Sequence, residues 1–127
     1  MNQAMKDGTT PAYAASYQGQ TAALELLVKA GCDGNKAAGG GETPAFVAAQ
    51  NGQTAALDIL VKAGCDVNQA AKNGMTPAYV AAEEGHTAAL KYLVKAGCDV
   101  NQAAKDGRTP ADIAAQNPGL TLSLIHI

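Results

Sequence analysis

The sequence predicts an all-α fold in which helix-turn-helix units stack into a solenoid and hairpin loops connect them. The 127-residue chain repeats itself with a period of 33, because Pro recurs at positions 11, 44, 77 and 110 and Cys at 32, 65 and 98. Residues 40–72 and 73–105 are identical at 25 of 33 positions. Self-similarity at such a period is typical of repeat architectures, so one unit describes the fold.

The first helix of each unit is predicted from a Thr-Pro pair. In the second copy, the Thr43 hydroxyl can accept a hydrogen bond from the unpaired N–H groups at a helix start. Pro44 at the first helical position lacks an N–H that would have no partner there. Gly52 ends this helix after about two turns. We therefore expect first helices near residues 10–18, 43–51, 76–84 and 109–117.

The second helix follows after a tight turn. Thr54 is expected to cap it, and Leu57, Leu60 and Val61 share one face because they are spaced at i, i+3 and i+4. Gly64 stops the helix, and an exposed loop leads to the next unit. We therefore expect second helices near residues 21–30, 54–63 and 87–96.

Stacking is required for burial, because two short helices cannot cover their apolar face alone. Two features predict weak points in the stack. The fourth unit lacks a second helix, so Leu90, Leu93 and Val94 should be less covered than their equivalents in the second unit. Gly34 stands where the next unit has Val67, so the first unit should lack a packing side chain there.

The repeated unit resembles the ankyrin repeat. Thr-Pro, Ala-Ala, a helix-ending Gly, a Leu-rich second helix and Gly-x-Asp-x-Asn recur in register over residues 1–117. The Thr-Pro-Leu-His of the family becomes Thr-Pro-Ala-Tyr at 10–13 and 76–79, Thr-Pro-Ala-Phe at 43–46 and Thr-Pro-Ala-Asp at 109–112, so the usual His link between repeats is missing. The resemblance implies a module that binds a partner protein through its concave face.

The register divides the chain into repeats. Residues 1–6 end a truncated preceding repeat, 7–39, 40–72 and 73–105 are repeats 1 to 3, 106–117 are a partial repeat 4, and 118–127 are a non-repeat tail. Residues 122–127 resemble the translation of the mosaic-end adapter used in transposase-based DNA library preparation. We hypothesise that the reading frame runs from a longer native gene into adapter. A genuine apolar tail is the alternative.

Composition excludes several classes of function. The formal net charge is −2 and only 16% of residues are charged, so the basic surface of a nucleic-acid-binding protein is not expected. No apolar run reaches 18 residues and no secretory signal is visible, so we expect no membrane insertion and a cytoplasmic or otherwise intracellular location, with the nucleus left open.

No catalytic or cofactor-binding pattern recurs in the sequence. The three cysteines lack the short paired spacing of zinc ligands and are expected to be reduced, structural thiols. His86 stands at a turn position that carries Gln in other copies, which favours a structural role. The sequence therefore predicts a protein that is not an enzyme and that has no metal, cofactor or small-molecule substrate.

Differences between the copies concentrate at the hairpins and at the ends of the first helices. The resemblance places these positions on the concave face, and we predict that they bind an unidentified partner protein. They are Thr9, Tyr17, Gln18, Glu42, Gln50, Asn51, Lys72, Asn73, Met75, Glu83, Glu84, Lys105, Asp106 and Arg108.

Two side chains are predicted to anchor the partner. Met75 is expected to be an exposed apolar anchor, and Tyr17 offers a second one. Glu42, Glu83 and Glu84 favour a ligand with a basic segment, with Arg108 at the far end. Neutral drift at exposed positions is the alternative explanation of the variation. A structural spacer within a longer protein is the alternative function, and the near-identity of the copies favours it.

Overall fold

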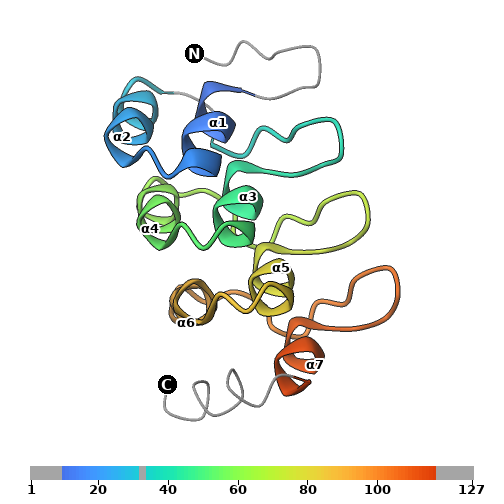
Figure 1. Ribbon diagram of the computed structural model, residues 1–127. Helices are drawn as coiled ribbons and strands as arrows, with labels where there is room; N and C mark the ends of the chain where they lie inside the picture. The colour runs from blue at the N-terminus through green and yellow to red at the C-terminus, as the bar shows by residue number, and fades with distance from the viewer. Residues whose placement is uncertain (1–9, 32–33, 117–127) are drawn as a thin grey trace.

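The computed structural model describes residues 10–31 and 34–116, and in this part of the chain seven helices form a regular stack (Figure 1). The first helices of the four units are α1 (Pro11–Gln18), α3 (Pro44–Gln50), α5 (Pro77–Glu83) and α7 (Pro110–Ala115). The second helices are α2 (Thr21–Lys29), α4 (Thr54–Lys62) and α6 (Thr87–Lys95). The predicted all-α fold and its helix positions are confirmed.

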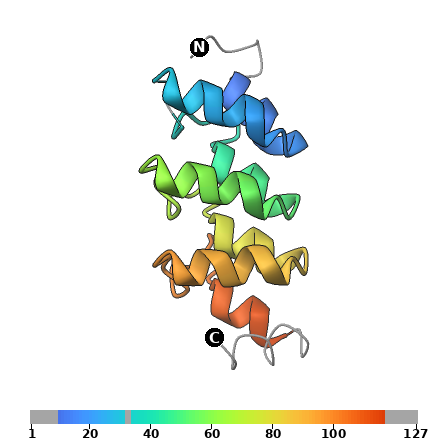
Figure 2. The same ribbon diagram turned by 90° about the vertical axis from the view of Figure 1, so that its left-hand side faces the viewer.

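The helices form two parallel layers. α1, α3, α5 and α7 make up one layer and α2, α4 and α6 the other, and each helix contacts its counterpart in the next unit (Figures 1 and 2). The hairpin loops project from the layer of first helices, on the side away from the second helices (Figure 1). No helix in the described residues is long and apolar enough to cross a bilayer.

Threonine caps the first helices as predicted. The Thr43 Oγ1 accepts a hydrogen bond from the Phe46 N–H at 3.1 Å, and Thr10 and Thr76 do the same in their own units. At α7 the cap is reciprocal, because Thr109 accepts from the Asp112 N–H while the Asp112 carboxylate accepts from the Thr109 N–H. Each Thr-Pro pair thus sets the first residue of a helix.

The predicted cap of the second helices is wrong. Thr54 is the first helical residue of α4, and the preceding Gln53 occupies the N-cap position without a side-chain hydrogen bond. The turn is tight enough for the Thr54 N–H to donate to the Gly52 carbonyl at 3.0 Å. The Leu57 N–H, which a Thr54 cap would have engaged, donates to the Gln53 carbonyl at 3.1 Å instead, so the hydroxyl is not needed there.

Replacement of the two threonines by alanine should separate these roles. Thr43→Ala is expected to lower the free energy of unfolding by about 1 kcal/mol, because it removes a helix cap. Thr54→Ala should change it by no more than about 0.5 kcal/mol. Urea denaturation followed by circular dichroism measures both, and an equal loss in the two variants would contradict the assignment.

The core runs along the stack between the two layers. Every alanine of α3 and α5 is at most 2% exposed, and the second helices contribute Leu24, Leu57 and Leu60, each with no exposed surface. The expectation that the third unit is less covered is wrong, since Leu90 and Leu93 are 2% and 0% exposed. Contacts of α6 with α5 and α4 explain this burial, because these two helices cover its leucine face.

The surroundings of Gly34 also differ from the expectation that a packing side chain is missing there. A Cβ built on Gly34 would collide with the Cys65 Sγ, and the next nearest atom is the Leu60 Cδ2 at 3.6 Å. The sulfur of the following unit therefore occupies the space that a side chain at residue 34 would need. Gly34 therefore leaves no hole in the stack.

Candidate functional site

Three hairpins stand side by side along one edge of the stack, at residues 38–42, 71–75 and 104–108 (Figure 1). Each is closed by a backbone hydrogen bond, such as the one from the Ala71 N–H to the Met75 carbonyl at 2.9 Å. Neighbouring hairpins are joined by bonds from the Lys72 N–H to the Gly40 carbonyl at 2.9 Å and from the Lys105 N–H to the Asn73 carbonyl at 3.1 Å. The hairpins are therefore fixed relative to one another.

Glycine makes this close approach possible. Gly41 and Gly74 have φ angles of 85° and 82°, in the left-handed region that side-chain-bearing residues rarely adopt. A Cβ at Gly41 would lie 2.7 Å from the Lys72 backbone N, and one at Gly74 would lie 2.8 Å from the Lys105 backbone N. Both glycines therefore permit the backbone bonds between the hairpins.

A recess of about 490 Å³ lies between the first two hairpins and the helices α3 and α5. Its apolar lining includes Phe46, Ala71 and Val80. Six of the residues predicted to bind a partner also line it: Glu42, Gln50, Lys72, Asn73, Met75 and Glu83. The structure thus brings together variable positions from two hairpins and two helices.

Met75 is less exposed than expected. Its side chain is partly buried and packs against the hydrophobic core. The Asn73 side chain holds this segment, because its Nδ2 donates to the Met75 Sδ at 3.0 Å and its Oδ1 accepts from the Met75 N–H at 3.0 Å. The hairpin thus turns Met75 toward the helices, so this residue forms part of the wall of the recess and does not project from it.

Two of the residues predicted to bind a partner, Asp106 and Arg108, form an ion pair with each other in the third hairpin. The Arg108 guanidinium contacts the Asp106 carboxylate at 2.8 Å, and the Arg108 N–H donates to the same carboxylate at 3.0 Å. These two interactions, the backbone bond first, hold the pKa of Asp106 below its usual value. The buried Tyr79 donates its hydroxyl proton to Asp106 at 3.5 Å. Arg108 is thus paired locally, and Lys105 beside it is exposed.

The remaining predicted residues lie outside the recess lining. Tyr17, which is 52% exposed, lies with Gln18 at the end of α1, and Glu84 is exposed after α5. Asn51 has a structural contact, because its Nδ2 donates to the Tyr17 carbonyl of the preceding unit at 3.1 Å. Thr9 lies outside the described residues, as do residues 118–127.

A polar link between α4 and α6 was not predicted from the sequence. The Tyr92 hydroxyl donates to the Asp58 Oδ1 at 2.7 Å, and the Lys62 Nζ contacts the Asp58 Oδ2 at 3.1 Å. The Tyr92 hydrogen bond, and then Lys62, lower the pKa of Asp58. Burial, and then Asp58, raise the pKa of Tyr92 to about 12. The sequence does contain a signal for this link, because both positions differ between copies. Glu25 stands one repeat before Asp58, and Ile59 stands one repeat before Tyr92.

This link should appear in the stability of the protein at alkaline pH. The pKa of Tyr92 is raised by folding, so its contribution to stability is present below its ordinary value of 10 and is lost as the pH rises toward about 12. The urea midpoint of the parent protein should fall more between these pH values than that of Tyr92→Phe. Tyr17→Phe is the control, because Tyr17 is exposed, and it should follow the parent protein.

Titratable side chains form no evident reaction centre in the described part of the chain. No group of three or more His, Cys, Asp or Glu residues is placed to hold a metal ion there. Cys65 and Cys98 are partly buried thiols, and burial, followed by the charge of Asp99, raises the pKa of Cys98 to about 11. The Cys98 thiolate, which is the nucleophilic form, is therefore scarce at neutral pH.

Comparison with known proteins agrees with this architecture. A family model described as "Ankyrin repeats (3 copies)" matches residues 1–71 and 46–124. A search of curated proteins gives no match.

Proposed function

Because the chain belongs to the ankyrin repeat family, we propose that its concave face, formed by the hairpins and the first helices, binds a partner protein. Ankyrin repeats are in general protein-protein interaction modules. The observation that carries the proposal for this chain is the recess, because variable side chains from two hairpins and two helices line it together. An interface of this kind combines an apolar centre with polar residues at its rim.

The fixed arrangement of the hairpins also supports partner binding at the concave face. The hydrogen bonds between the hairpins fix the backbone around the recess before any partner arrives. A partner that binds there therefore loses little free energy to ordering of the array. The proposed contact residues remain those at the hairpins and at the first-helix ends, with Asn51 and Asp106 also serving the contacts within the array.

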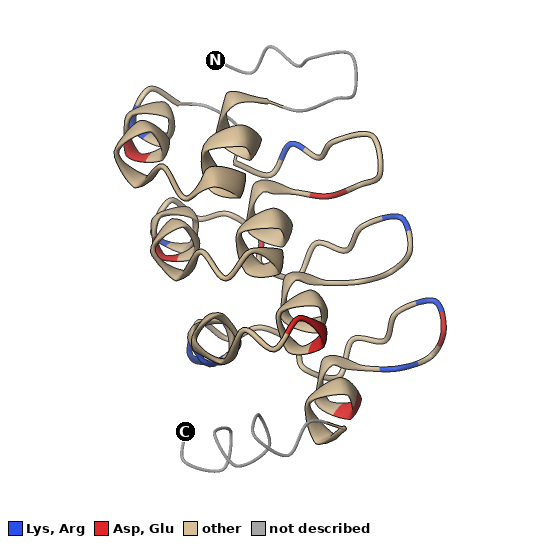
Figure 3. Cartoon of the chain, viewed as in Figure 1, with Lys and Arg blue, Asp and Glu red and all other residues tan. Residues whose placement is uncertain are grey.

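Charge favours a partner with a basic segment. Acidic residues lie on α5 and on the hairpin before α3 (Figure 3), where Glu42, Glu83 and Glu84 are found. Opposite charges of this kind steer association, and salt screens them. We therefore expect partner binding to weaken as the ionic strength rises.

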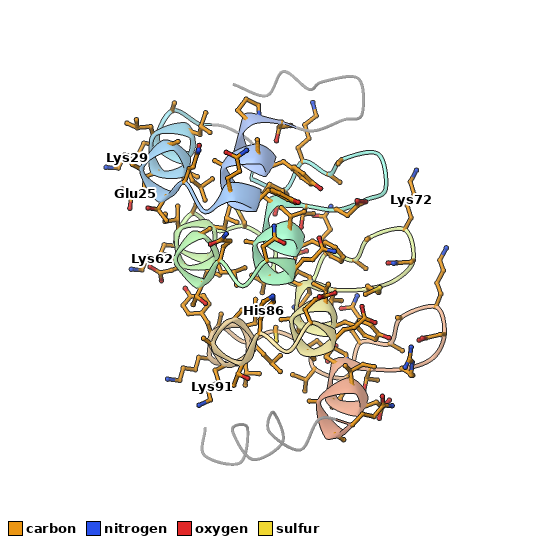
Figure 4. All side chains as sticks on the ribbon, in the orientation of Figure 1. Glu25, Lys29, Lys62, Lys72, His86 and Lys91 are labelled. Carbon is orange, nitrogen blue, oxygen red and sulfur yellow. The ribbon has the colours of Figure 1, made fainter. Side chains whose placement is uncertain are left out.

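Selection from a library of random displayed peptides tests the proposal. Peptides enriched on the folded array should lose binding to Met75→Ala and to the double variant Glu83→Lys/Glu84→Lys. Glu25→Ala and Lys29→Ala are the controls, because both residues lie on α2, on the side opposite the hairpins (Figure 4). Peptides that depend on the control residues and not on the concave face would place the interface elsewhere.

A spacer within a longer protein is the second candidate. The identity of residues 40–72 and 73–105 at 25 of 33 positions favours it, because a scaffold needs only the residues that stack. A library selection that enriches no peptide dependent on the array would support this role.

A further inference from the structure

The recess combines an apolar floor with two acidic side chains. Met75, which is partly buried, and Phe46, which is 5% exposed, supply its apolar surface, and Val80 lies behind them at 1% exposed. Glu42 and Glu83 reach it from different elements, the first hairpin and the end of α5. An apolar surface beside two carboxylates selects for a ligand that is apolar at one point and positively charged at the next.

The two carboxylates are available to a ligand. Among the described residues, the ion pairs involve neither the Glu42 nor the Glu83 carboxylate. Asp106 first, and the more distant charge of Glu83 after it, raise the pKa of the Arg108 guanidinium. Among the described residues that line the recess, Lys72 is the one cation, and its exposed side chain stands at the hairpin tip (Figure 4). The Arg108 guanidinium is held by Asp106 at 2.8 Å.

We propose that the recess binds a short extended segment of a partner protein, with one apolar side chain against Met75 and the exposed edge of Phe46 and an adjacent Lys or Arg between Glu42 and Glu83. This inference rests on the proposed function and names the chemistry of the segment. The volume of about 490 Å³ suits a side chain with its flanking backbone, because ligand sites begin at about 300 Å³. The rim is open, since Asn73 and Glu83 are exposed, so a chain can enter and leave the recess.

The hydrogen-bonded hairpins make this arrangement specific. The bond from the Lys72 N–H to the Gly40 carbonyl ties the hairpin of Glu42 to that of Met75. The spacing between the acidic and the apolar parts of the recess is therefore set before binding. A segment with the same composition but with its cation and apolar residue far apart should bind less well.

Three capped synthetic peptides serve as probes, namely Ala-Arg-Leu-Lys-Ala, Ala-Glu-Leu-Glu-Ala and Ala-Arg-Ala-Lys-Ala. Binding to the full chain is followed by amide chemical shifts in NMR spectra. The first peptide should shift the amides around Met75 and Glu83, and the second and third should bind at least about tenfold more weakly. The double variant Glu42→Gln/Glu83→Gln should weaken the first peptide by at least about tenfold.

Glu25→Gln is the matched control, because it makes the same carboxylate-to-amide change on α2, on the side opposite the hairpins (Figure 4). It should change the dissociation constant by less than about twofold. Equal binding of the acidic peptide around Met75 would overturn this inference and leave the proposed function intact. Full binding by the Glu42→Gln/Glu83→Gln variant would overturn it as well. If none of the three peptides shifts the amides around Met75 and Glu83, the inference fails, whereas the proposed function fails only if the library selection also enriches no peptide that depends on the concave face.

Discussion

Gly74→Ala is expected to lower the free energy of unfolding by about 2–4 kcal/mol, which combines the strain of a left-handed residue with the loss of a hydrogen bond. Its φ is 82°, and the new Cβ would lie 2.8 Å from the Lys105 backbone N and 3.1 Å from the Ala104 Cα. Backbone atoms cannot rotate away from such a contact. The bond from the Lys105 N–H to the Asn73 carbonyl must therefore lengthen or break.

Gly107→Ala provides the matched control for this prediction. Gly107 occupies the equivalent turn position with a φ of 86°, but the Cβ that alanine adds there would meet no atom within 4 Å. This variant should lose only about 1–2 kcal/mol, which is the cost of the left-handed conformation alone. Urea denaturation gives both values, and their difference measures the close approach of the hairpins. Equal losses would mean that the approach contributes nothing.

Leu60→Ala is expected to destabilise the array by about 3–5 kcal/mol, because it opens a cavity in the core. Leu60 has no exposed surface, and its Cδ2 lies 3.6 Å from the Cβ position of Gly34 in the preceding unit. The cavity would therefore open at the junction of two repeats. Thermal and urea denaturation should show the loss.

Leu26→Ala is the control, since it makes the same chemical change on a second helix at a site that is 70% exposed. It should alter the free energy of unfolding by less than about 0.5 kcal/mol. A small effect of Leu60→Ala would contradict the assignment of the core to the space between the helix layers.

The fold was predictable because its main determinants are local in the sequence. A Thr-Pro pair caps and starts a helix through atoms three residues apart, as the Thr43 contact with Phe46 shows. The 33-residue period then indicates that each unit packs like the next. The prediction failed for Thr54, where a backbone bond within a tight turn replaced the expected side-chain cap.

The candidate site was only partly predictable. Variation between the copies identified Glu42, Met75 and Glu83, which the structure brings to one recess. The period did not show that Met75 turns toward the core, nor that Tyr92 reaches Asp58. These contacts depend on the direction of each side chain and on residue pairs that differ from one repeat junction to the next. A repeat pattern shows only what the junctions have in common.

The contacts between neighbouring units also have a consequence for the speed of folding. The Tyr17–Asn51, Asn68–Asp99 and Asp58–Tyr92 hydrogen bonds join residues 34, 31 and 34 positions apart, so they bridge about one repeat each. Chain closure over such short loops is fast, and it does not slow as units are added. One helix pair can form first and serve as the template on which the next one folds. Lengthening the array by a further 33-residue unit would therefore raise its stability without raising the barrier to its folding.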